Sequence, residues 1–187
     1  MKTMILEPGK YYHIYNRARN GDPLFANDES FKFFLRLYRT HIMPVADTYA
    51  YCLLKDHLHI LLRIKENVSG SVYKPFAVLF NAYTSGYNRR NGKEGRLFQF
   101  KLKRIEIRKE PYFLEMVRYI NQNARKHQAA EDFCNYRFSS FRATVTLNES
   151  MICKDELIRQ FGGRENLVRN LGTEVVEKNV KMFLLED

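Results

Sequence analysis

Two histidines separated by a single residue, His57 and His59, form the first pattern in the chain that suits a metal ion. Residues 57–64 alternate between two sets of side chains, which is the period of a β-strand. Residues two apart on a strand point the same way, with Cβ atoms about 6–7 Å apart, so both imidazoles can reach one cation. The alternative is a pair of surface histidines on a solvated sheet face.

A tyrosine with a nearby amide is the second candidate for chemistry. Residues 110–127 carry apolar side chains at helical spacing. Tyr119 and Asn123 lie four residues apart and therefore share a face of the predicted helix. This spacing places the Tyr119 hydroxyl beside the Asn123 amide oxygen, which we predict as a metal ligand, with His127, one turn further on, as a reserve ligand. The alternative is that Tyr119, one of 12 tyrosines, borders the core.

Basic and aromatic residues are interleaved between the second predicted helix and the last predicted strand. Basic side chains neutralise phosphates and aromatic rings stack on unpaired bases, which favours single strands or loops over a uniform duplex. A solvated basic loop is the alternative. The residues predicted to contact nucleic acid here are Arg89, Arg90, Lys93, Arg96, Phe98, Lys101, Lys103 and Arg104.

Composition supports a nucleic-acid partner and argues against a membrane protein. The 187 residues carry a net charge of +10, concentrated in residues 1–147, because residues 148–187 hold more acidic than basic side chains. A basic domain of this size usually binds a polyanion. No apolar run is long enough to span a membrane or to serve as a signal peptide, so we expect a cytoplasmic protein. The three cysteines show no C-x-x-C spacing and are expected to be reduced.

The elements that position these side chains are expected in the order strand, helix, strand, strand, helix, strand. The strands are predicted at residues 11–15, 45–54, 57–64 and 103–108, and the helices from an N-cap at Asp28 to before Pro44 and at residues 71–88. This order predicts an α+β fold of the ferredoxin-like, split βαβ type, an antiparallel sheet with helices on one face.

A third helix, residues 110–127, is predicted to follow this unit. Two short helices are expected at residues 154–161 and 164–171, separated by a glycine pair. The change in charge and these glycines divide the chain into a catalytic domain, residues 1–147, and a helical C-terminal appendage, residues 148–187.

Five motifs, in this order, resemble those of the single-tyrosine HUH transposases, most closely the REP-associated tyrosine transposases and the transposases of small insertion sequences. They are YHIYNR at 12–17, AYCLL at 50–54 running into DHLHILL at 56–62, YNRR at 87–90 with GRLFQ at 95–99, VRYI at 117–120 with Asn123, and FSSFR at 138–142. The resemblance covers about residues 9–143.

The sequence departs from that family at several positions. The family usually has proline and asparagine before the first histidine, where this chain has Lys55 and Asp56, and a proline after the helix asparagine, where it has Ala124. Phe138 and Phe141 stand where Trp and Tyr are usual. No catalytic group is lost, although Asp56 changes the charge beside the predicted metal site.

The resemblance implies a transposase that cleaves and rejoins single-stranded DNA through a 5′-phosphotyrosine intermediate on Tyr119. It implies Mg²⁺ or Mn²⁺ at His57, His59 and Asn123, and imidazole ligands make Mn²⁺ the easier fit. It also implies a hairpin DNA substrate, gripped by the basic stretch together with Arg17 and Arg19, and either a monomer or a homodimer.

Two other functions are compatible with the same sequence. An inactive or domesticated relative would bind hairpin DNA as a regulator without cutting it. A single-stranded RNA-binding module would use exposed aromatic residues on the sheet, such as those of residues 11–15, and would not need His57 or His59.

Overall fold

Four antiparallel strands form one sheet at the centre of the protein. The computed structural model describes residues 6–19, 21–99, 102–146, 148–173 and 175. The sheet order is β2-β3-β1-β4. The strands are β1 (Tyr11–Arg17), β2 (Ala46–Leu53), β3 (His57–Ile64) and β4 (Lys103–Ile107). The predicted α+β fold with an antiparallel sheet is confirmed, and the observed ends of β3 coincide with the predicted ones.

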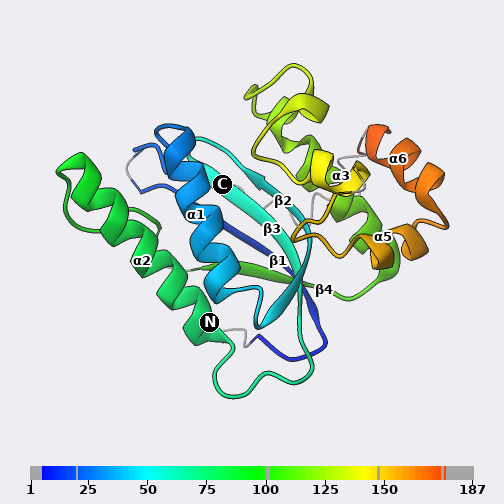
Figure 1. Ribbon diagram of the computed structural model, residues 1–187, viewed down its shortest axis with the longest axis horizontal. Helices are drawn as coiled ribbons and strands as arrows, with labels where there is room; N and C mark the ends of the chain where they lie inside the picture. Colours follow the sequence, from blue (N-terminus) through cyan, green and yellow to red (C-terminus); the bar gives the residue numbers. More distant parts are fainter. Residues whose placement is uncertain (1–5, 20, 100–101, 147, 174, 176–187) are drawn as a thin grey trace.

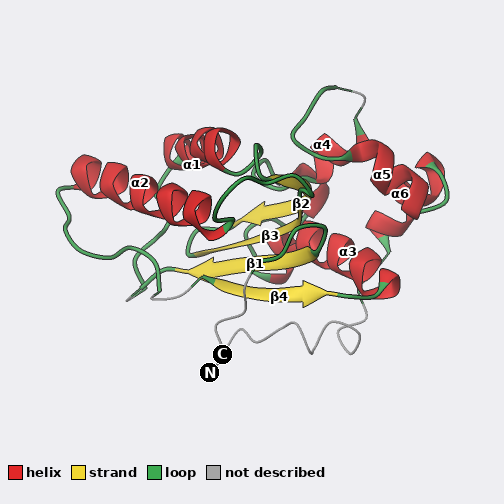
Figure 2. Ribbon diagram, turned by 90° about the horizontal axis from the view of Figure 1, so that it is seen from below, coloured by secondary structure: helices red, strands yellow, loops and turns green. Residues whose placement is uncertain are grey.

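Helices lie on both sides of this sheet. Helices α1 (Asp28–His41) and α2 (Tyr73–Asn91) lie side by side over one face, as predicted (Figures 1 and 2). Helix α3 (Glu110–Lys126) packs against the opposite face, where its Phe113 ring contacts Tyr11 of β1 and Tyr49 of β2. The sheet therefore has an α1/α2 face and an α3 face, and both are covered.

Strand register sends both histidines of β3 to the α3 face. Tyr15 of β1 pairs with His59, and Arg17 pairs with His57. Because side chains alternate along a strand, Leu58 and Ile60 point to the α1/α2 face and are buried there. The apolar side chains of β3 thus pack into the core on the α1/α2 face, and its two histidines face α3.

Helix α1 begins one residue earlier than the sequence suggested. Its N-cap is Asn27, not Asp28, because the Asn27 side chain accepts a hydrogen bond from the Ser30 backbone while the Ser30 hydroxyl accepts one from the Asn27 backbone. Asp28 instead lies in the first turn, where its negative charge suits the helix dipole. Helix α2 packs tightly against α1 at Gly86, where an added Cβ would lie 2.6 Å from the Phe33 ring.

The outer edge of β2 is covered by the C-terminal third of the chain. Ser139 and Ile152 form isolated bridges with Cys52 and Thr48, which limits the exposed edge. The elements of this part are a 3-10 turn η1 (Phe133–Asn135), α4 (Phe141–Val145), α5 (Lys154–Gln160) and α6 (Arg164–Gly172). The last two match the predicted helices, whereas η1 and α4 were not predicted. The boundary proposed near residue 147 stays a prediction.

Two expectations from composition can be compared with the structure. No helix within the described residues is long and apolar enough to cross a membrane. All three cysteines are free, as predicted, and Cys52 is fully buried between β2 and α3, where burial raises the pKa of its thiol.

Candidate metal centre and nucleic-acid interface

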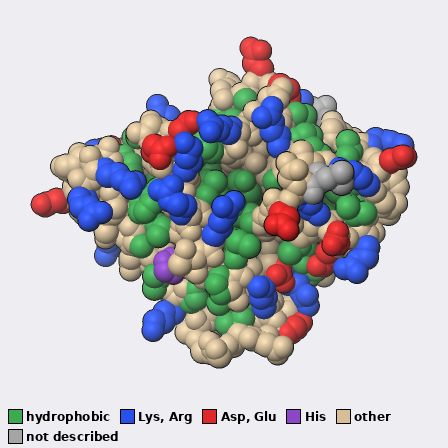
Figure 3. All heavy atoms as spheres, viewed as in Figure 1, with side chains coloured by type: hydrophobic (Ala, Val, Ile, Leu, Met, Phe, Trp, Pro, Cys, Tyr) green, Lys and Arg blue, Asp and Glu red, His purple; other side chains and the backbone are tan. Residues whose placement is uncertain are grey.

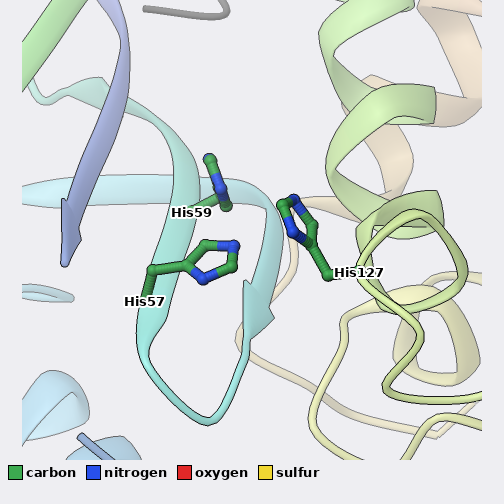
Figure 4. Close-up of side chains that lie close together, drawn as sticks. All are labelled: His57, His59 and His127. Carbon is green, nitrogen blue, oxygen red and sulfur yellow. The ribbon is translucent and has the colours of Figure 1, made fainter. Parts of the chain in front are cut away.

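Three histidines converge where β3 meets the end of α3. One ring nitrogen from each of His57, His59 and His127 lies within 4.8 Å of the other two, and Figure 4 shows the three rings turned toward a common point. The ring centroids of His57 and His127 are 4.3 Å apart, and those of His57 and His59 are 5.2 Å apart. His57 and His59 are buried, so the cluster is a compact set of nitrogen donors with little solvent around it.

His127 comes to this cluster from the C-cap of α3. The sequence had ranked it as a reserve ligand behind Asn123, yet His127 is the third member of the cluster that the structure forms. Helical spacing places Asn123 one turn earlier on the same face, between His127 and Tyr119. The signal was present in the sequence, because positions 119, 123 and 127 form one line along a helix.

Asn123 has an unusual environment. Its side chain is fully buried, and neither amide atom has a hydrogen-bond partner among the described residues. A buried amide in this state costs roughly 1–3 kcal/mol, so it calls for an explanation. An amide oxygen is a competent metal ligand, and Asn123 lies one helical turn before His127, so its amide can join the histidines as a further donor to a cation.

Tyr119 lies next to the histidines. Its ring centroid is 5.9 Å from that of His59, with the rings perpendicular, and the ring is 3% exposed. The ammonium group of Lys126 lies 5.0 Å from the same ring centroid. The predicted nucleophile and the predicted metal ligand are therefore neighbours within one chain.

A buried polar network fixes the position of α3 against β2. The Ser140 hydroxyl donates to Asn121 Oδ1 at 2.7 Å and accepts from the Tyr51 backbone at 3.0 Å. Asn121 in turn donates to the Val117 carbonyl. Because Asn121 lies in the middle of α3, this network sets how Tyr119 and His127 face the sheet.

Asp56 supports His57 from the turn between β2 and β3. Its carboxylate oxygen lies 2.7 Å from His57 Nδ1. Partial burial by itself would raise the pKa of Asp56, but the hydrogen bond and charge of His57, with a smaller contribution from Arg17, lower that pKa overall. A carboxylate on one ring nitrogen of a histidine fixes the ring and its tautomer and directs the other nitrogen to a metal.

A small cavity opens beside the histidines. It has a volume of about 120 Å³ and is lined by His57 and His59, by Arg17 at the end of β1, by Lys103 at the start of β4, and by Gln99. Tyr119 does not line it but contacts the His59 ring that does. Two cations and a pair of imidazoles around one cavity favour an anionic group such as a phosphate.

A larger groove continues from this cavity to the α1/α2 face. It has a volume of about 500 Å³ and shares Asn16 and Gln99 with the first cavity. Polar side chains of α2, including Asn81 and Ser85, form one wall, and exposed Arg96 lies on the other. A groove of this volume with polar side chains in its walls can take a nucleotide next to the cavity.

The other predicted DNA contacts lie at several places. Arg19, Arg89, Arg90, Lys93 and Arg96 are exposed at the end of β1, on α2 and in the loop after it. Lys93 forms an ion pair with Asp22 at 2.6 Å, and Arg90 packs over the Phe33 ring. Lys and Arg side chains are spread over α1 and α2, with a few acidic side chains among them (Figure 3).

Two further predicted contacts, Phe98 and Arg104, lie on the α1/α2 face, and one lies outside the described residues. Phe98 lines the groove, but it is 6% exposed and packs against Phe80 and Tyr83, so most of its ring surface is already covered. Arg104 points to the α1/α2 face, over Tyr73, away from the histidines. Lys101 lies outside the described residues.

Comparison with known proteins gives a likeness of fold. No family model matches the chain, and no curated protein matches it. A solved structure of a REP-associated tyrosine transposase bound to a REP hairpin superposes with a TM-score of 0.61. The match covers 78% of this chain and 84% of that protein at 17% sequence identity, so it establishes the same fold.

Proposed function

We propose that this protein is a metal-dependent transposase that cuts and rejoins single-stranded DNA through a covalent bond to Tyr119. The observation that carries the proposal is the meeting of Tyr119, a buried histidine cluster and a cavity with two cations at one end of the sheet. The solved structure with the same fold is a transposase bound to a DNA hairpin, and hairpin DNA is the substrate class that we propose here.

The donor set fits a divalent cation. His57, His59 and His127 would hold it, with Asn123 Oδ1 as a further ligand. Imidazole nitrogens suit Mn²⁺ better than Mg²⁺, which prefers oxygen ligands. When bound, the cation would polarise the scissile phosphate and offset the charge that develops during displacement.

The residues of the chain then have separate tasks. Arg17 and Lys103 hold the phosphate in the cavity next to His59. The Tyr119 oxygen forms a bond to phosphorus, the bond from phosphorus to the 3′ oxygen breaks, and the phenol proton leaves as the departing oxygen becomes a 3′ hydroxyl.

Rejoining reverses these bonds. A 3′ hydroxyl attacks the phosphotyrosine, the bond between phosphorus and the tyrosine oxygen breaks, and Tyr119 regains a proton. One phosphodiester is lost and one is formed over the whole reaction, so no nucleotide energy source is required.

The RNA-binding alternative loses its main support. It requires aromatic side chains of β1 on an open sheet face, but Tyr12 and Tyr15 are at most 9% exposed, and α3 covers the face that Tyr15 occupies. An inactive regulator would have the same fold and the same basic surface, so only a test of DNA cleavage distinguishes it from the enzyme.

The decisive experiment is a test for covalent capture. The protein, Tyr119→Phe and Tyr112→Phe are incubated with Mn²⁺ and a labelled pool of hairpin single-stranded DNAs with randomised flanks, then separated on a denaturing gel. Tyr112 is a tyrosine of the same helix and serves as the matched control. We expect an adduct with the parent and Tyr112→Phe but not with Tyr119→Phe. DNA binding without an adduct from any of the three would identify a regulator.

A further inference from the structure

His13 is a buried imidazole to which the proposed reaction assigns no role. It lies on β1 opposite Leu61 of β3 and Ile105 of β4, in the interior of the sheet, and is 1% exposed. Its side chain points to the α3 face, since Tyr15, two residues on, pairs with His59 on that face. A histidine in such a position loses most of its contact with water and is retained at a cost unless its polar atoms are used.

A ring nitrogen of His13, Nε2, contacts a histidine of the proposed metal centre. His13 Nε2 lies 2.9 Å from His59 Nδ1, with both residues buried. The two rings are stacked, with centroids 5.1 Å apart and planes 15° apart, and Tyr15 stacks on His13 at 5.0 Å. A hydrogen bond to His13 and the stacking of nearly parallel rings therefore hold His59 in place.

The chemistry of ligation decides the direction of that hydrogen bond. A histidine that binds a metal through Nε2 must be unprotonated at that nitrogen, so neutral His59 carries its proton on Nδ1. The Nδ1–H then donates to His13 Nε2, which must accept and so carries no proton itself. Metal binding by His59 thus requires one tautomer of each ring.

We propose that His13 is a positioning residue of the metal centre, holding His59 in the orientation and tautomer in which its Nε2 faces the cation. The proposal rests on the metal centre of the proposed function. His13 binds Nδ1 of His59 in the same way that Asp56 binds Nδ1 of His57. Both histidines of β3 therefore have a hydrogen-bond partner at Nδ1. Such partners both orient the ligand and raise its basicity, and their loss typically weakens metal binding about 10–100-fold.

Three variants separate positioning from packing. His13→Phe keeps a planar ring in the stack but removes the acceptor. His13→Gln restores an acceptor oxygen near the position of Nε2. Tyr11→Phe is the matched control, because it removes a hydrogen bond to Glu156 from a residue of the same strand and face without touching His59. Folding of all variants is checked by circular dichroism and thermal melting.

The readout is Mn²⁺ affinity without DNA, from titration of the free ion by electron paramagnetic resonance. We expect the dissociation constant to rise about 10–100-fold in His13→Phe, to recover at least in part in His13→Gln, and to stay unchanged in Tyr11→Phe. In the metal-free parent, imidazole ¹⁵N spectra should show His59 protonated on Nδ1, and His13→Phe should lose that preference.

Each failure has a separate meaning. Parent-like Mn²⁺ affinity in a folded His13→Phe protein would overturn the positioning role and leave the metal centre intact. A His59 protonated on Nε2 in the metal-free parent would overturn it as well. A parent that binds no Mn²⁺ would instead refute the metal centre and, with it, the role of His13.

Discussion

The phenol of Tyr119 stands edge-on to the imidazole of His59, with 5.9 Å between the ring centroids and 87° between the ring planes. One residue comes from α3 and the other from β3, and the polar network around Asn121 and Ser140 fixes how these elements meet. The contact lies within one subunit. The nucleophile and the metal ligands that we propose can therefore act together without a residue from a second copy.

The His127 imidazole is expected to be a full metal ligand. His127→Ala should weaken Mn²⁺ binding by more than the roughly 10–100-fold that follows loss of a supporting hydrogen bond, because a donor itself is removed. His41→Ala, at the end of α1, is the matched control and should bind as the parent does. Titration with Mn²⁺ measures both, and equal affinity of His127→Ala and the parent would exclude His127 from the centre.

Asn123 should show opposite effects on stability and metal binding. Its two amide atoms are buried with no hydrogen-bond partner among the described residues, so Asn123→Leu, of similar size, should stabilise the metal-free protein by about 1 kcal/mol. For a chain of this length that corresponds to roughly 2–4 °C in Tm. Added Mn²⁺ should raise the Tm of the parent more than that of the variant. A variant that melts lower without metal would contradict this account of Asn123.

The strand and the helix that carry the site could be predicted because their apolar residues recur with the clear spacing of a strand and of a helix. The alternation in β3 identified both its ends and the shared face of His57 and His59. The sequence placed Asn123 and His127 on the face of Tyr119, but it could not show that the His127 ring reaches the two strand histidines. His127 lies at the C-cap of α3 with non-helical dihedral angles, so helical spacing alone does not say where its ring points. Its place depends on how α3 crosses the sheet.

The nucleic-acid surface was harder to predict for a related reason. Composition locates basic and aromatic residues along the chain but does not say which face each one takes. Phe98 and Arg96 both line the groove, but Phe98 is buried there and Arg96 is exposed. Lys103 and Arg104 are adjacent in sequence but point to opposite faces of the sheet, and only Lys103 reaches the cavity beside the histidines.

Filling the groove should weaken binding of the single-stranded flank of the DNA. Asn81→Trp places a large side chain on the groove wall, while Val78→Trp adds the same side chain to the same helix at an exposed site outside the groove. Since one stacked base contributes about 1–3 kcal/mol, we expect roughly tenfold weaker binding by Asn81→Trp and no change by Val78→Trp. Fluorescence anisotropy with hairpins carrying or lacking a flank measures the effect. If Asn81→Trp weakened binding of both hairpins equally, the single-stranded flank would not lie in this groove.

Glu156 should make stability depend on pH through the contact between α5 and the sheet. Tyr11 and Tyr49 donate hydrogen bonds to its two carboxylate oxygens, at 2.6 and 2.5 Å. Burial by itself would raise the pKa of Glu156, but these hydrogen bonds outweigh it and lower the pKa of the folded state. The unfolded carboxyl therefore takes up its proton first as the pH falls. The stability that the ionised group contributes is complete above the unfolded pKa and disappears as the pH drops through the folded one.

Glu156→Gln tests that relationship directly. At pH 7 the variant should be less stable by about 1–2 kcal/mol, because neutral hydrogen bonds replace charge-assisted ones. The difference in free energy of unfolding between the parent and the variant should shrink once the pH falls below the usual pKa of a glutamate. Urea unfolding at a series of pH values measures it, and Glu165→Gln, at an exposed position on α6, is the control that should show no such trend. A gap that stays constant down to acidic pH would mean that Glu156 acts through packing, because its charge would then have no part in holding α5 to the strands beside the histidine cluster.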